Sequence, residues 1–273
     1  MSTETNPVVN IEEVEEQKAP SAPNRLKRVK LIVAYDGTNY HGWQVQPNGE
    51  TIEGVLNRTL SSLLGEKIVV TGASRTDAGV HSMGNVAVFD TKSRIPAEKI
   101  SYALNQRLPE DIVVQKSEEV PADFHPRHCD SRKTYEYRIL NREFPLPMYR
   151  NNTYFCYRKL DLEKMQQAAE YLKGEHDFKS FCSNKRMKKS TVRRMDQIGI
   201  HTDGTKVVFT YTGNGFLYNM VRILTGTLLE VGLGKRRPEE MTAVLEARNR
   251  EAAGATAPPE GLLLMQVEYD GEA

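Results

Sequence analysis

Hydrophobic and polar positions along this chain follow two periods, one typical of strands and one typical of helices. Residues 29–35 and 84–90 read as half-buried strands, while residues 52–64 repeat apolar positions at helical spacing after Thr51, a predicted N-cap. In chain order, the first set of elements comprises strands at 29–35, 67–72, 84–90 and 112–117, and helices at 52–64 and 96–108. The resulting order, β-α-β-β-α-β, is the split arrangement of ferredoxin-like folds.

The second part of the chain repeats this order of elements without a repeat at the level of residues. It comprises predicted strands at 134–140, 192–201, 206–212 and 262–269, and predicted helices at 162–172, 216–231 and 238–248. We therefore predict an α/β (α+β) fold built from two ferredoxin-like halves. Two such halves that share one continuous sheet would leave a cleft between them.

The charge distribution separates the first residues from the rest. Residues 1–24 hold five glutamates and one lysine, a net charge of −4, so the remainder carries +5 of the total of +1. Because this segment has little apolar content, we predict a disordered acidic tail over residues 1–25. The remaining chain divides into an N-terminal α/β domain at 26–119, which carries Asp77, and a C-terminal α/β domain at 120–273.

Composition excludes several classes of protein. No apolar run approaches the length of a membrane span, and the first residues do not resemble a signal peptide, so we expect a cytoplasmic protein without membrane contact. The three cysteines are too few and too scattered for a disulfide framework, and the six histidines lack metal-ligand spacing. We expect no metal, and no cofactor, since neither a dinucleotide fingerprint nor a phosphate-binding loop is present.

Residues 75–81, with the sequence R-T-D-A-G-V-H, place one carboxylate in a tight turn between two predicted strands. Because Arg75 precedes Asp77 by two residues, we expect the arginine to lower the pKa of this carboxyl and keep it ionised. An ionised aspartate suits a nucleophile or an electrostatic stabiliser. The alternative is an ordinary Asx-turn, in which Asp77 caps its own backbone and Gly79 supplies a positive φ angle.

Five segments resemble, in order, the signatures of the tRNA pseudouridine synthase A family. They are Y-D-G-T-N-Y-H-G-W-Q at 35–44, R-T-D-A-G-V-H at 75–81, R-K-T-Y-E-Y at 132–137, N-M-V-R at 219–222 followed by Gly226, and P-E-G-L-L-L at 259–264. The resemblance covers nearly all of residues 26–269. It implies a homodimer with a mixed, mostly antiparallel sheet that converts uridines at tRNA positions 38, 39 and 40, in the anticodon stem and loop, to pseudouridine.

The resemblance also implies roles for individual residues. Asp77 would be the nucleophile, Tyr135 would contact the target base, and Arg222 would pair with Asp77 and, together with Arg75, hold it charged. Asp77 would attack C1′ of the uridine or help to remove a proton from the sugar, and the sequence leaves both routes open. Without the resemblance, Tyr135 reads as a residue packed on a sheet face and Arg222 as a cation that extends from an apolar helix to solvent.

A basic run at 185–194 contains six cations and no acid. Such a run is usually a solvated loop. With an RNA substrate we expect it to contact phosphates, because neutralising phosphates supplies most sequence-independent affinity. The residues assigned to this role are Lys188, Lys189 and Arg193, and the surface could extend to Arg127, His128, Arg132 and Lys133.

Two other classes of protein fit parts of the sequence. A non-catalytic RNA-binding protein would keep the cleft without turnover, and intact Asp77, Tyr135 and Arg222 argue against it. A hydrolase would use Asp77 as a nucleophile on another glycosidic bond, which normally requires a second carboxylate about 5 Å away.

Ser74 departs from the family pattern, which has glycine at this position in many members. A serine is tolerated there only if the backbone does not need a positive φ angle.

Overall fold

The computed structural model describes residues 25–184 and 186–270. Apart from Arg25, the predicted acidic tail lies outside the described residues, as does Lys185 of the basic run. Within the described part of the chain, none of the helices has the length and apolar character that crossing a membrane requires.

The first half has the predicted order of elements. These are β1 (Lys27–Tyr35), α1 (Ile52–Leu64), β2 (Thr71–Gly72), β3 (His81–Thr91), α2 (Ala97–Asn105) and β4 (Ile112–Val120). Thr51 caps α1 as predicted, since its side chain accepts a hydrogen bond from the backbone of Gly54. Strand β2 is shorter than predicted because side chains of α1 satisfy the backbone before it: Ser61 bonds Ile68, and Asn57 bonds Val70.

The second half adds short elements to the predicted order. These are β5 (Ser131–Asn141), β6 (Tyr154–Cys156), α3 (Leu162–Glu170), β7 (Gly174–Asp177), β8 (Val192–Asp203), β9 (Lys206–Gly213), α4 (Met220–Gly232), α5 (Glu240–Ala247) and β10 (Leu262–Tyr269), with 3-10 turns η1 (Pro147–Tyr149), η2 (Lys179–Phe181), η3 (Arg250–Ala252) and η4 (Pro259–Gly261). Strands β6 and β7 were not predicted, because three or four residues are too few to show a period. Helix α4 begins later than predicted because the backbone of Asn219 is in the left-handed region, with φ of 61°. A right-handed helix cannot extend through a residue in that conformation.

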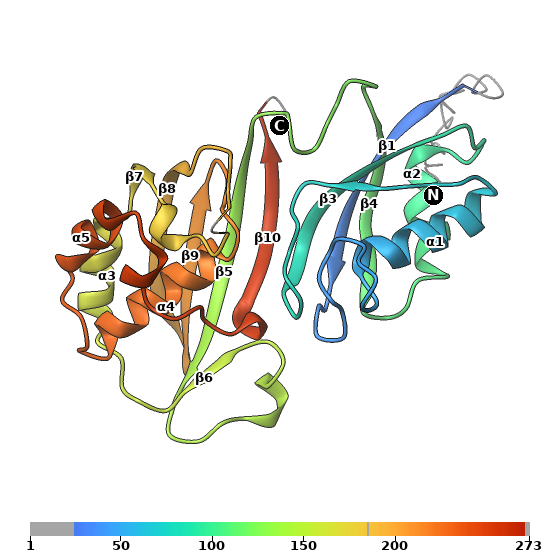
Figure 1. Ribbon diagram of the computed structural model, residues 1–273. Helices are drawn as coiled ribbons and strands as arrows, with labels where there is room; N and C mark the ends of the chain where they lie inside the picture. Colours follow the sequence, from blue (N-terminus) through green and yellow to red (C-terminus); the bar gives the residue numbers. More distant parts are fainter. Residues whose placement is uncertain (1–24, 185, 271–273) are drawn as a thin grey trace, which may run out of the picture.

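One mixed, mostly antiparallel sheet runs through both halves in the order β4-β1-β3-β10-β5-β9-β8-β7, with β2 on β3 and β6 on β5. The halves meet where the last strand, β10, pairs in parallel with the start of β3 and antiparallel with β5. Figure 1 shows β10 beside β5 at the centre, with α1 and α2 on one lobe and α3, α4 and α5 on the other. The predicted fold class is therefore confirmed.

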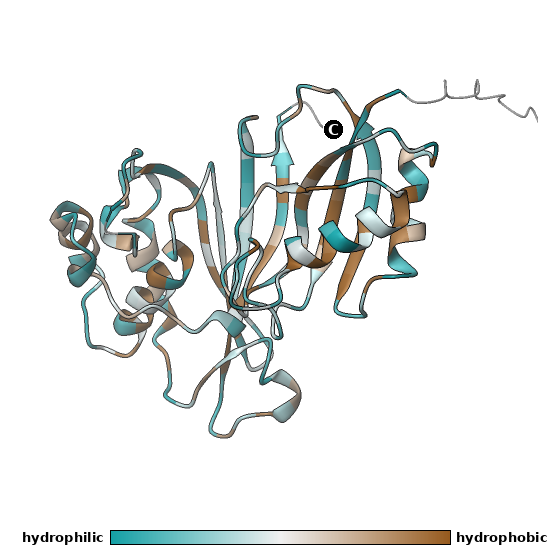
Figure 2. Cartoon of the chain, turned by 45° about the vertical axis from the view of Figure 1, so that its right-hand side comes forward, coloured by the Kyte–Doolittle hydropathy of each residue, from teal (hydrophilic) through white to brown (hydrophobic). Residues whose placement is uncertain are grey.

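Each half builds a core of its own. In the first half, α1 and α2 pack on β1, β3 and β4 around buried Trp43 and Leu56. In the second, α3, α4 and α5 cover β5, β8 and β9 around Phe178 and Phe209. Figure 2 shows apolar colour on the strands of the first half and on helix faces, while the connections are mostly hydrophilic. On the basis of these two cores we propose the division into domains at 26–119 and 120–273.

Candidate active site

A cleft of about 1560 Å³ opens where the two halves meet. It is lined by the turn between β2 and β3, the start of β5, the segment before β8, and the N-terminal end of α4. Asp77, Arg75, Tyr135 and Arg193 line this cleft, so the fold brings together residues that are far apart in the sequence. Arg222 reaches Asp77 from α4 without lining the cleft itself.

Asp77 lies in the predicted connection between strands. The turn closes through a hydrogen bond from the backbone of Val80 to the carbonyl of Asp77, at 3.2 Å, and Gly79 supplies a φ of 76°. Among the described residues, the hydrogen-bond partner of the Asp77 carboxylate is Arg222 and not its own backbone. The Asx-turn is therefore not formed, and the carboxylate is free to face the cleft.

A buried asparagine holds the turn that carries Asp77. Asn85 on β3 is 0% exposed. Its side-chain amide accepts from the backbone nitrogen of Ser74 at 3.2 Å and donates to the backbone carbonyl of Ser74 at 3.0 Å. The hydroxyl of Tyr35 bonds that of Thr76 at 2.8 Å, and the backbone of Trp43 donates to Thr76 at 3.0 Å. Because these contacts grip both ends of residues 74–76, the carboxylate that follows is held in a fixed direction.

Sequence reasoning missed Asn85 and Tyr35. Both lie in predicted strands, where a single polar side chain gives no sign of its partner. The available signal was an asparagine at position 85 among apolar neighbours of a strand, since a buried amide requires hydrogen bonds. Trp43 is buried, and its indole packs directly on Gly72.

The guanidinium of Arg222 makes the contact with Asp77. Its Nη1 donates to Oδ2 of Asp77 at 3.2 Å and to Oδ1 of Asn219 at 3.1 Å, while its Nε donates to the carbonyl of Ala257 at 2.7 Å. The side chains of Arg222 and Asp77 are only 15% and 19% exposed. Arg222 therefore does not extend to solvent, and the cation shares a poorly hydrated site with the carboxylate.

The expectation that a neighbouring arginine lowers the pKa of Asp77 is wrong in its net direction. Burial raises the pKa of Asp77 above its ordinary value, and the charge and hydrogen bond of Arg222 oppose this without overcoming it. Arg75 is exposed in the cleft, and among the described residues it makes no hydrogen bond or ion pair with Asp77. Although Arg75 and Asp77 are only two residues apart in the turn, their side chains do not meet.

Tyr135 lies on β5, opposite Leu264 of β10 and Tyr211 of β9. The residue is 9% exposed, and its ring meets that of Phe216 edge to face, with centroids 4.9 Å apart. Burial raises the pKa of the Tyr135 hydroxyl to about 12, and the negative charge of Asp77 contributes to this. The ring is therefore both a packed residue of the sheet and a neutral wall of the cleft beside Asp77.

Lys133 is a cation in the cleft with no acidic partner among the described residues. Its Nζ donates to the carbonyl of Ala73 at 2.8 Å, which ties β5 to the turn that carries Asp77. Burial, and then the charges of Arg127, Arg193 and Arg75, lower the pKa of Lys133 to about 8. Four cations thus converge on one wall of the cleft, which favours an anionic ligand there.

The basic run divides into two parts. Arg193 is half-buried on β8 and lines the cleft, as do Arg186 and Arg194. Lys188 and Lys189 are exposed on the loop before β8 and do not line it. Arg127, His128, Arg132 and Lys133 all line the cleft, and Asp196, which also lines it, pairs with Arg132 and Arg194.

Metal-ligating groups do not converge at this site. Among residues 25–184 and 186–270, no group of three or more histidine, cysteine or acidic side chains is arranged to hold a metal ion. The cleft presents the carboxylate of Asp77, which Arg222 holds, together with the aromatic ring of Tyr135.

Comparisons with known proteins agree with this arrangement. A family model described as tRNA pseudouridine synthase matches residues 31–128 and 168–270, a span that includes Asp77 and Arg222. The chain is 49% identical over 244 residues to tRNA pseudouridine synthase A of Acetivibrio thermocellus, covering 89% of this chain and 100% of that protein. It is 47% identical over 239 residues to tRNA pseudouridine synthase A of Halalkalibacterium halodurans, covering 87% of this chain and 91% of that protein.

Proposed function

The chain belongs to the tRNA pseudouridine synthase family, and we propose that it isomerises uridine to pseudouridine at positions 38, 39 and 40 in the anticodon stem and loop of tRNAs. The observation that carries this proposal is the contact of Arg222 with Asp77 at 3.2 Å, made beside Tyr135 in the basic cleft. A half-buried carboxylate held by one arginine, next to a flat aromatic face, suits chemistry on an extruded nucleoside.

In this proposal Asp77 acts on the sugar and Tyr135 on the base. The carboxylate attacks C1′ or assists removal of a sugar proton, and either route breaks the bond from N1 to C1′. The detached uracil turns and C5 bonds to C1′, which breaks the bond from Asp77 to C1′ in the first route, while in the second route the removed proton returns to the sugar. The proton on C5 is then lost and N1 gains a proton, so the mass is unchanged. Stacking on the tyrosine would contribute about 1–3 kcal/mol toward holding the flipped base.

We also propose that the enzyme works as a homodimer in the cytoplasm. The support is the resemblance of its five signature segments to a dimeric family. Light scattering on the purified chain should then give about twice the 30.9 kDa of one copy.

The direct test is to map pseudouridine in unmodified tRNA transcripts after incubation with the purified protein. We expect mass-neutral conversion confined to uridines at positions 38, 39 and 40, and no conversion when these are replaced by cytidine. Release of free uracil would instead indicate a hydrolase, and tight binding without conversion would indicate an RNA-binding protein.

The exposed lysines of the basic run should affect affinity more than turnover. Replacing Lys188 and Lys189 with glutamine should raise Kd for tRNA and flatten its dependence on salt by roughly one log unit of slope per lost contact. The control is the Lys67→Gln/Lys99→Gln variant, which removes the same charge at exposed positions in the first half of the chain, outside the basic run at 185–194. If Kd depended equally on salt concentration in the two variants, Lys188 and Lys189 would belong to a solvated loop that does not contact tRNA.

Titration of Lys133 should make tRNA binding depend on pH in a range where phosphates do not titrate. Its pKa of about 8 means that the lysine is charged at neutral pH and loses its charge as pH rises through that value. At about pH 9, one unit higher, roughly nine tenths of it would be neutral in the free enzyme. We expect Kd measured by filter binding to rise from pH 7 to 9, and to rise less in Lys133→Met. An identical rise in both proteins would contradict the assignment.

A further inference from the structure

Residues 253–258, here called the crossing segment, join η3 to η4 and lie directly across helix α4. The nitrogen of Gly254 donates to the hydroxyl of Thr227 at 2.9 Å, and that hydroxyl donates to the carbonyl of Ile223 at 2.7 Å. The backbones approach so closely that a methyl group added at Gly226 would lie 1.8 Å from the carbonyl oxygen of Ala255. The crossing segment is thus seated on α4 by shape and by hydrogen bonds.

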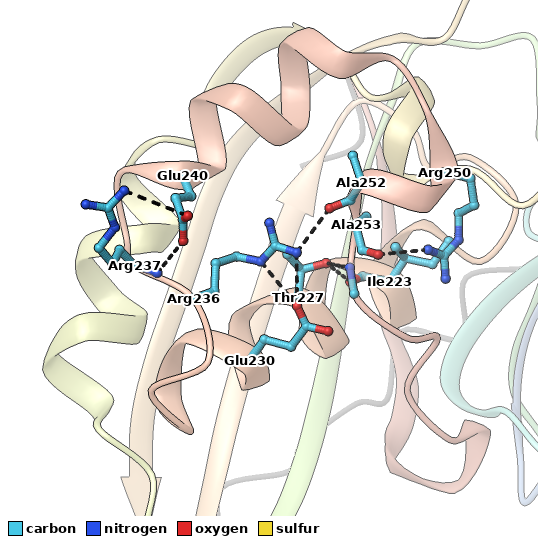
Figure 3. Close-up of polar contacts among 10 residues, drawn as sticks. Ile223, Thr227, Glu230, Arg236, Arg237, Glu240, Arg250, Ala252 and Ala253 are labelled. Carbon is cyan, nitrogen blue, oxygen red and sulfur yellow. Dashed lines mark hydrogen bonds and ion pairs between the residues drawn. The ribbon is translucent and has the colours of Figure 1, made fainter.

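Two arginines hold the chain where η3 passes into the crossing segment, as Figure 3 shows. Arg250 donates to the carbonyl of Ala253 at 3.3 Å and to the hydroxyl of Thr256 at 3.1 Å. Arg236 donates to the carbonyl of Ala252 at 3.1 Å while it pairs with Glu230 of α4 at 3.1 Å. None of these side chains lines the cleft, so contact with a ligand there does not explain them.

The far end of the crossing segment meets Arg222 twice. The nitrogen of Ala257 donates to the carbonyl of Arg222 at 3.0 Å, and the carbonyl of Ala257 accepts from Nε of the same arginine at 2.7 Å. The next carbonyl, that of Pro258, accepts from the hydroxyl of Tyr137 at 2.7 Å. One residue of the crossing segment therefore fixes both the backbone and the guanidinium of Arg222.

This contact determines where the guanidinium points. An arginine side chain has several rotatable bonds, and holding it in one conformation has an entropic cost that must be offset by fixed partners. Because the guanidinium is planar, a bond at Nε sets the plane of the whole group. With Nε on Ala257, Nη1 is directed at Asp77 and Asn219.

We propose that the crossing segment positions Arg222 on Asp77, and that Gly226 and Arg250 are positioning residues for the reaction. The proposal rests on the function proposed above, since it assumes that Asp77 carries out the chemistry. Because Gly226 has no side chain, the crossing segment can approach α4 closely enough for Ala257 to bond Arg222. Arg250, at the start of η3, holds the segment through its bonds to Ala253 and Thr256.

The experiment compares Gly226→Ala, which pushes the segment off the helix, with Arg250→Met, which releases it without adding atoms to the interface. We expect kcat for pseudouridine formation to fall about 10- to 100-fold in Gly226→Ala, as a displacement of about 1 Å does in other enzymes. Arg250→Met should show a smaller fall, and KM for tRNA should change little in either. The acidic limb of kcat should move to higher pH in both, because burial raises the pKa of Asp77 and Arg222 opposes it.

The matched control is Arg237→Met, which removes an exposed arginine whose partners are Glu239 and Glu240, away from the crossing segment. It should keep both kcat and the pH profile of the wild type. The proposal is overturned if the folded Arg250→Met variant keeps the wild-type acidic limb, or if it only raises KM. Failure of the wild type to form pseudouridine would overturn the proposed function instead, because every variant is compared with its activity.

Discussion

Replacing Asp77 with asparagine should abolish isomerisation while tRNA binding and the fold remain. The amide is nearly isosteric with the carboxylate and keeps an oxygen that can accept from Arg222, which lies 3.2 Å away. It cannot act as an anionic nucleophile or accept a sugar proton, so we expect kcat to fall about 10⁴-fold or more. Single-turnover conversion of labelled tRNA measures the chemical step apart from binding.

The control for this variant is Asp90→Asn, on the same half of the sheet. Asp90 pairs with Arg28 at the far end of β3, at 2.8 Å, and does not line the cleft. This variant should convert tRNA at close to the wild-type rate. If Asp77→Asn retained a comparable rate, or if it lost tRNA binding together with turnover, the carboxylate would not have the role proposed here.

The fold was largely predictable from the sequence because long elements carry a clear period. The helix after Thr51 and the strand predicted at 84–90 lie close to where the pattern placed them. Prediction failed where backbone groups bond to side chains in place of a partner strand, as at Ile68 and Val70. It also failed for β6 and β7, which form only because the completed sheet offers them an edge.

At the site, the sequence predicted which residue types converge but not how they are held. The resemblance implied that Arg222 pairs with Asp77, and the structure has this contact between residues 145 positions apart. The influence of Arg75 was overestimated, because proximity along a turn says nothing about where a side chain points. The raised pKa of Asp77 depends on burial in the folded chain, which a local motif does not contain.

Replacing Arg222 with methionine should lower both turnover and stability. Turnover should fall about 10²- to 10³-fold, the usual effect of removing one donor that stabilises charge in the transition state. The free energy of unfolding should fall by about 2 kcal/mol at neutral pH. This is below the 3–5 kcal/mol for breaking a fully buried pair, since the two side chains remain 15% and 19% exposed.

The stability loss should depend on pH in a direction that identifies its cause. Without Arg222, burial acts unopposed and raises the pKa of Asp77 further in the folded state, so the folded variant binds a proton that the unfolded chain releases. The variant should therefore regain stability relative to wild type as pH falls and the carboxyl is protonated. Adding Asp77→Asn to Arg222→Met should restore the lost stability at neutral pH, because no charge is then left unpaired in the site. Urea unfolding of the wild type, the two single variants and the double variant at two pH values measures this coupling. If Arg222→Met lost the same free energy of unfolding with aspartate and with asparagine at position 77, Arg222 would stabilise the fold through packing and its bond to Ala257, independently of Asp77.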